Sequence, residues 1–162
     1  MCMRDCDIDC LFPQFEKDFV SSARADTVES GYVYEFEHIF ESYLEKGAVF
    51  ASKMLFKLLK KHYRDVHIVK AILHAISHYS YRELGDAFVM EILSLCHHEN
   101  KGVKKFALKV FDNWEAIETL EALKHIAPIE ETWIENYRQE IIRHLEHLKE
   151  HSIDFCRSGY KQ

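Results

Sequence analysis

Apolar residues recur along most of the chain at the spacing of an α-helix. From Pro13 to about Glu150 they return every three to four positions, which places them on one face of a helix with 3.6 residues per turn. The polar stretch Ser21–Gly31 breaks the pattern and is predicted to be a loop. We predict helices at about 14–24, 32–46, 48–63, 66–81, 86–97, 102–114, 115–127 and 130–150.

The core-facing pattern also repeats. Four copies of one stripe, with core positions at 0, +3, +4, +7, +8 and +11, follow each other in steps of 32, 35 and 31 residues. Two residues do not fit the stripe, Gly47 and Arg138. Another helix precedes each copy, and this arrangement is typical of a solenoid of helix pairs. An irregular bundle of helices of similar length is the alternative. The copies start at Phe36, Ile68, Val103 and Ile134.

The stretch 102–123, GVKKFALKVFDNWEAIETLEAL, resembles a HEAT repeat. A Val-x-x-x-Ala helix, here with Val103 and Ala107, runs through a short Asp-containing turn into a second helix. Trp114 stands where the family has a small residue in the turn. The resemblance implies an all-α fold, an α/α superhelix (HEAT-like solenoid) of about four antiparallel helix pairs, which binds macromolecules and inherits no catalytic residues. It is best over 85–127 and looser over 32–81 and 129–150.

Composition supports a helical globular protein. Five Gly and two Pro among 162 residues are too few for the turns of a sandwich or barrel. No stretch approaches the roughly 18 uncharged apolar residues of a membrane span. We expect a flexible, cysteine-containing leader at 1–12, a single HEAT-like domain at 13–151 and a tail at 152–162.

The cysteines indicate a reducing compartment. Their number, five, is odd, and the N-terminus has no apolar segment typical of a secretion signal, so we expect a cytoplasmic protein. Cys2, Cys6 and Cys10 recur every four residues. A reduced leader, a soft-metal site and acylation at Cys2 are the three interpretations of that spacing. Cys96 is predicted to fill the core.

In a solenoid, the second helices of the pairs would line one surface with polar residues from equivalent positions. We predict that this surface is rich in Lys and His and binds another protein. The residues predicted to bind the partner are Lys70, His74, Lys105, Lys109, His78, Asn113, Glu140 and His144.

The predicted function is a non-catalytic protein-binding module without a cofactor. Small size and a net charge of −6 fit an inhibitor or immunity-type protein that covers a basic toxin or enzyme, in which case the Glu-rich ends would bind instead of the Lys/His surface. Nucleic acid is not the expected partner, because few lysines are available for phosphate contacts. A DNA glycosylase-type site using Trp114 and Trp133 is an alternative, but we expect both rings to pack between helices.

A metal protein or enzyme is the competing class. His74 and His78 stand at i and i+4, so that both imidazoles can reach one ion from the same helix face. No complete ligand set or catalytic motif accompanies them locally. The two histidines therefore remain candidates, while neither a metal nor an enzyme activity is predicted.

Overall fold

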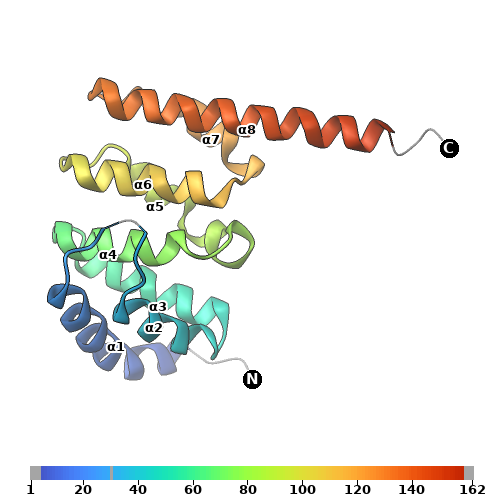
Figure 1. Ribbon diagram of the computed structural model, residues 1–162. Helices are drawn as coiled ribbons and strands as arrows, with labels where there is room; N and C mark the ends of the chain where they lie inside the picture. The colour runs from blue at the N-terminus through green and yellow to red at the C-terminus, as the bar shows by residue number, and fades with distance from the viewer. Residues whose placement is uncertain (1–4, 30, 159–162) are drawn as a thin grey trace. The chain divides into compact units, whose positions relative to one another are not determined.

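The computed structural model describes residues 5–29 and 31–158, and this part of the chain contains helices and no strand (Figure 1). The all-α prediction is therefore confirmed. No helix among the described residues has both the length and the apolar character needed to cross a membrane. The α-helices are α1 (Asp5–Ala25), α2 (Glu35–Leu44), α3 (Ala48–Lys61), α4 (Val66–Ser77), α5 (Asp86–Leu95), α6 (Lys101–Trp114), α7 (Leu120–His125) and α8 (Thr132–Ser158); a π-helix η1 (Tyr81–Gly85) and a 3₁₀-helix η2 (Ile117–Thr119) lie between them.

The helices form two compact units, Met1–Phe88 and Val89–Gln162. In the first unit α1 packs against α2, α3 and α4. Aromatic rings fill this contact, because Phe15 lies 4.8 Å from Tyr43 and Phe19 lies 5.2 Å from Phe36 between ring centroids. In the second unit α8 packs against α6, η2 and α7. The boundary falls inside α5, within the range predicted as one domain.

The predicted core stripe is confirmed at the level of burial. Each of its positions in all four copies is buried or half-buried. Arg138, a misfit in the pattern, is buried because its guanidinium donates to the carbonyls of Leu123 and Ile126, both at 2.9 Å, and pairs with Glu135 at 2.7 Å. These three bonds compensate much of the cost of burying the cation, while its Nε has no hydrogen-bond partner among the described residues.

The first helix begins earlier than predicted. We expected it to start at residue 14, after a flexible leader, but α1 begins at Asp5 and contains Pro13. Ile8 and Phe12 are buried and extend the apolar face across the proline. Because Pro13 and Asp9 are both exposed, the carbonyl that loses its amide partner can bond to water. Cys2 and the side chain of Cys6 lie outside the described residues, while Cys10 is exposed and free on α1.

Gly85 lies where one helix type changes into another. It closes the π-helix η1, which runs directly into α5. A Cβ atom at this position would lie 2.2 Å from Cδ2 of Tyr81, so the ring occupies the space that a side chain would need. The predicted helix 66–81 accordingly ends at Ser77, before this segment.

Two further core predictions have different outcomes. Cys96 is buried as expected, and desolvation raises the pKa of its thiol to about 12, so the thiol stays protonated. Trp114 is also buried. The prediction for Trp133 is wrong, because its side chain is 53% exposed at the start of α8, before the buried stripe begins at Ile134.

Candidate functional site

The predicted partner-binding residues fall in both units. Lys70 and His74 belong to α4, His78 directly follows its last residue, and the other five belong to α6 and α8. Seven of the eight are exposed or half-buried, but His74 is buried with 3% of its surface exposed. The prediction that His74 belongs to an exposed binding surface is therefore wrong. The reason is local: the segment preceding α2 covers the ring of His74 and bonds to it.

In the second unit two side-chain contacts join α6 and the residue after it to α8, close to the predicted residues Lys109 and His144. Asp112 joins the two helices, because its carboxylate accepts a 2.6 Å hydrogen bond from the Tyr137 hydroxyl and contacts Lys109 at 3.3 Å. His144 lies 3.0 Å from the carboxylate of Glu115, at the end of α6. We call Lys105, Lys109, Asn113, Glu140 and His144 the α6–α8 surface.

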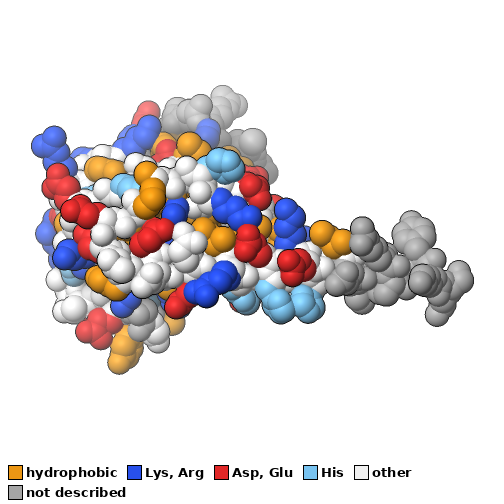
Figure 2. All heavy atoms as spheres, turned by 90° about the horizontal axis from the view of Figure 1, so that it is seen from above, with side chains coloured by type: hydrophobic (Ala, Val, Ile, Leu, Met, Phe, Trp, Pro, Cys, Tyr) orange, Lys and Arg blue, Asp and Glu red, His pale blue; other side chains and the backbone are white. Residues whose placement is uncertain are grey.

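The α6–α8 surface contains charges of both signs. On the face drawn in Figure 2, Lys and Arg side chains likewise alternate with Asp and Glu and do not gather into a block of one sign. Burial is the main cause that raises the pKa of Tyr137, and its bond to Asp112 raises the pKa further, so the hydroxyl remains a donor. The link between the two helices is therefore fixed, while the charged ends around it face solvent.

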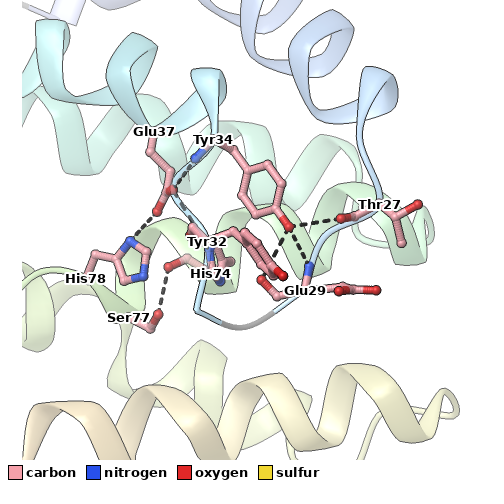
Figure 3. Close-up of polar contacts among 8 residues, drawn as sticks. All are labelled: Thr27, Glu29, Tyr32, Tyr34, Glu37, His74, Ser77 and His78. Carbon is pink, nitrogen blue, oxygen red and sulfur yellow. Dashed lines mark hydrogen bonds and ion pairs between the residues drawn. The ribbon is translucent and has the colours of Figure 1, made fainter.

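A second cluster lies in the first unit, where α2 and α4 meet the segment 26–34 (Figure 3). Glu37 comes from the first turn of α2, and His74 and His78 lie one turn apart at the end of α4. The helix dipole of α2 suits the Glu37 carboxylate, because a helix N-terminus favours an anion.

The carboxylate of Glu37 connects the three side chains. Its Oε2 accepts a 2.7 Å hydrogen bond from the backbone N–H of Tyr34, as part of a capping box at the start of α2. The same oxygen lies 3.8 Å from Nε2 of His74. Its Oε1 forms an ion pair with Nδ1 of His78. Because Glu37 is only 5% exposed, this charge is largely removed from water.

His74 is held in one tautomer. Its Nε2 lies 2.9 Å from the carbonyl oxygen of Tyr32, which can only accept, so Nε2 carries the proton. Desolvation is the main cause that lowers the pKa of His74; the neighbouring His78 lowers it further, while the Tyr32 carbonyl and the Glu37 charge oppose the shift. A neutral His74 therefore lies between Tyr32 and a buried carboxylate.

The ligand atoms of Glu37, His74 and His78 all lie within 4.8 Å of one another. One carboxylate and two imidazoles are a donor set that binds Zn²⁺ in proteins. The i, i+4 spacing predicted the two histidines as metal candidates. Glu37 was missed because it lies 37 residues earlier on another helix, and no local pattern links it to them.

The first unit also contains a hollow of about 530 Å³ between α3 and the segment η1–α5. Val49, Phe56 and Leu84 contribute to its apolar lining, and Lys53 and Arg82 also border it. Its size lies within the usual range of ligand pockets. The sequence did not predict this hollow, because the hollow depends on how the π-helix η1 lies against α3.

No protein-family model, curated protein or solved structure matches this chain.

Proposed function

We propose that the chain is a non-catalytic protein-binding module, built from HEAT-like helix pairs, and that the α6–α8 surface contacts its partner. The observation that carries the proposal is the pairing of α6 and α8 through Tyr137 and Asp112, with the predicted polar residues around that link. A preformed surface loses little conformational entropy when it binds.

The charge pattern supports a protein as the partner. The α6–α8 surface contains two lysines from α6, one glutamate from α8 and further polar groups, so a partner with a mixed surface would be complementary to it. An inhibitor or immunity-type protein that covers a toxin or enzyme is one form of such a module. Free thiols at Cys10 and Cys96 support a reducing compartment such as the cytoplasm.

The test is a double charge reversal, Lys105→Glu with Lys109→Glu. Lys17→Glu with Lys149→Glu is the matched control, because it changes the net charge equally at exposed lysines outside this surface. Proteins captured from the native cell are quantified for wild type and both variants, and the Kd of each candidate partner is then measured by calorimetry.

We expect at least one partner to bind the reversed variant about tenfold or more weakly, while the control retains wild-type affinity. The free energy of unfolding should change by less than about 0.5 kcal/mol in both variants, because the exchanged side chains are surface groups. If every captured protein binds the reversed variant at wild-type strength, the α6–α8 surface is not the binding site.

A further inference from the structure

We propose that Glu37, His74 and His78 form a binding site for one divalent transition-metal ion, with Zn²⁺ as the reference ion. The proposal is independent of the protein-binding function, since it concerns the first unit and a different set of residues. It starts from the position of the three donor atoms, which lie within 4.8 Å of one another at the junction of α2 and α4.

The distances are close to those of a coordination sphere. Zinc binds His nitrogen and carboxylate oxygen at about 2.0–2.2 Å, so two tetrahedral ligand atoms lie about 3.4 Å apart. Oε2 of Glu37 lies 3.8 Å from Nε2 of His74. Oε1 of Glu37 contacts Nδ1 of His78 directly. Small rotations of these side chains would place an ion within reach of all three.

The state of Glu37 is the second, independent observation. Its Oε1 is buried and receives no hydrogen bond of normal geometry from any residue that the structure describes. A carboxylate removed from water is costly unless it is paired and fully bonded. Among the described residues, Oε1 has one contact with an ionisable side chain, that of His78. Imidazole is itself a common metal ligand in proteins. A divalent cation would neutralise this charge directly.

The surroundings provide support for the ligands and a path for the ion. The N–H of Tyr34 fixes one oxygen of Glu37, as an outer hydrogen bond fixes carboxylate ligands in metal sites. The side chain of His78 is 34% exposed, against 6% for Glu37 and 3% for His74, so an ion can enter on the His78 side. Three protein ligands would leave a position for water.

Coordination changes the bond between His74 and Tyr32. Nε2 of His74 now carries the ring proton and donates it to the Tyr32 carbonyl. To bind an ion through Nε2, the ring must carry its proton on Nδ1, so the Tyr32 carbonyl loses this donor. The neutral His74 ring keeps its one proton during this change. The nitrogen of His78 that binds the ion must carry no proton, so a proton on that nitrogen would be released to solvent. Ion binding is therefore linked to the hydrogen bond that joins Tyr32 to His74.

The donor set also selects the kind of ion. Two imidazoles and one carboxylate favour Zn²⁺, Co²⁺, Ni²⁺ or Cu²⁺, whereas Mg²⁺ and Ca²⁺ prefer sites made of oxygen ligands.

A pair of exposed histidines on α8, His147 and His151, is a competing site among the described residues, with ring centroids 4.1 Å apart. It provides the matched control.

The experiment titrates the full-length chain with Zn²⁺ by calorimetry and with Co²⁺ by visible absorption, at neutral pH. All proteins carry Cys2→Ser, Cys6→Ser and Cys10→Ser, so that thiolates at the N-terminus cannot bind the ion. Glu37→Gln and His78→Gln test the site. Gln at position 37 retains an acceptor for the Tyr34 N–H, and His78 is exposed, so both variants should fold. His147→Gln with His151→Gln is the control.

We expect one ion per chain in the unmodified site and in the control, with the d–d bands of four-coordinate Co²⁺. Glu37→Gln and His78→Gln should each weaken binding at least about 100-fold, since loss of an outer partner alone costs 10–100-fold. Circular dichroism verifies the fold of each variant. The proposal would be overturned if the unmodified site did not bind the ion tightly, or if both site variants kept the affinity of the unmodified site. Loss of binding in the control variant alone would overturn it as well.

Discussion

At the scale of single residues, His74 shows how burial changes the role of a side chain. The stripe pattern placed it beside the apolar face, where polar residues usually meet solvent. In the structure the ring is covered, donates to the Tyr32 carbonyl and lies 5.3 Å from the Tyr34 ring between centroids. Desolvation therefore disfavours its charged form and lowers its pKa.

This lowered pKa predicts a loss of stability in acid. In the unfolded chain a histidine has its ordinary pKa of about 6.5, whereas the pKa of folded His74 is lowered, so His74 takes up its second proton only at lower pH. The unfolded state then binds more protons, so this contribution to the free energy of unfolding is complete above about pH 6.5 and decreases as the pH falls towards the lowered folded pKa. Urea unfolding at pH 7.5 and 5.5, with a chelator present, measures the decrease.

The control for this prediction is His74→Gln, which retains a donor for the Tyr32 carbonyl and cannot titrate. The variant should lose less stability than wild type between the two pH values. An identical decrease in both proteins would show that His74 does not contribute to the acid sensitivity.

At the scale of the elements, spacing predicted the helices well and their ends less well. Helices predicted at 48–63 and 102–114 agree with α3 and α6 to within two residues at each end. The start of α1 was missed because a proline normally lies at or just before the first turn of a helix, yet Pro13 lies inside α1 on an exposed face where its missing amide costs little. Apolar spacing from Pro13 onward did not show that the helix continues on the N-terminal side of the proline.

The turn after α6 has a residue that its backbone does not favour. Glu115 adopts φ 47° and ψ 35°, the left-handed region in which glycine is relaxed and other residues are strained. The resemblance to HEAT repeats raised the question of turn geometry at Trp114, and the structure places the unusual conformation one residue later.

We expect Glu115→Gly to stabilise the protein by about 0.5–1 kcal/mol, because relief of strain exceeds the entropy that glycine adds to the unfolded chain. The lost contact with His144 is exposed and contributes little. Chemical denaturation measures the gain. Glu118→Gly is the control: it removes the same charge from a 3₁₀ turn with ordinary φ and should destabilise. A destabilised Glu115→Gly would contradict this account.

At the scale of the whole molecule, composition and periodicity were enough to predict the all-α class. They were not enough for the site, because Glu37 reaches the two histidines only through the packing of α2 near α4. The α6–α8 surface was predictable in part: the periodic pattern gave its exposed residues, but the link between Tyr137 and Asp112 depends on which helices become neighbours.

Net charge gives a prediction that separates protein binding from nucleic-acid binding. With 27 acidic and 21 basic residues in the chain, and two lysines beside one glutamate on the α6–α8 surface, that surface offers no dense row of phosphate contacts. We expect it to leave a heparin column at about 50 mM salt. Retention that requires a steep rise in salt for elution would favour the nucleic-acid alternative.

The π-helix η1 holds one residue that a regular α-turn would not need. A π-turn holds about one residue more than an α-turn, so the segment Tyr81–Gly85 behaves like a local insertion. Deleting one residue there would let the coil close as a regular α-turn and would leave the following positions of α5 near their present phase. Phe88 would then stay beside Phe56, from which it now lies 6.2 Å between ring centroids. This stretch can therefore lose one residue without turning the core positions of α5 that follow it.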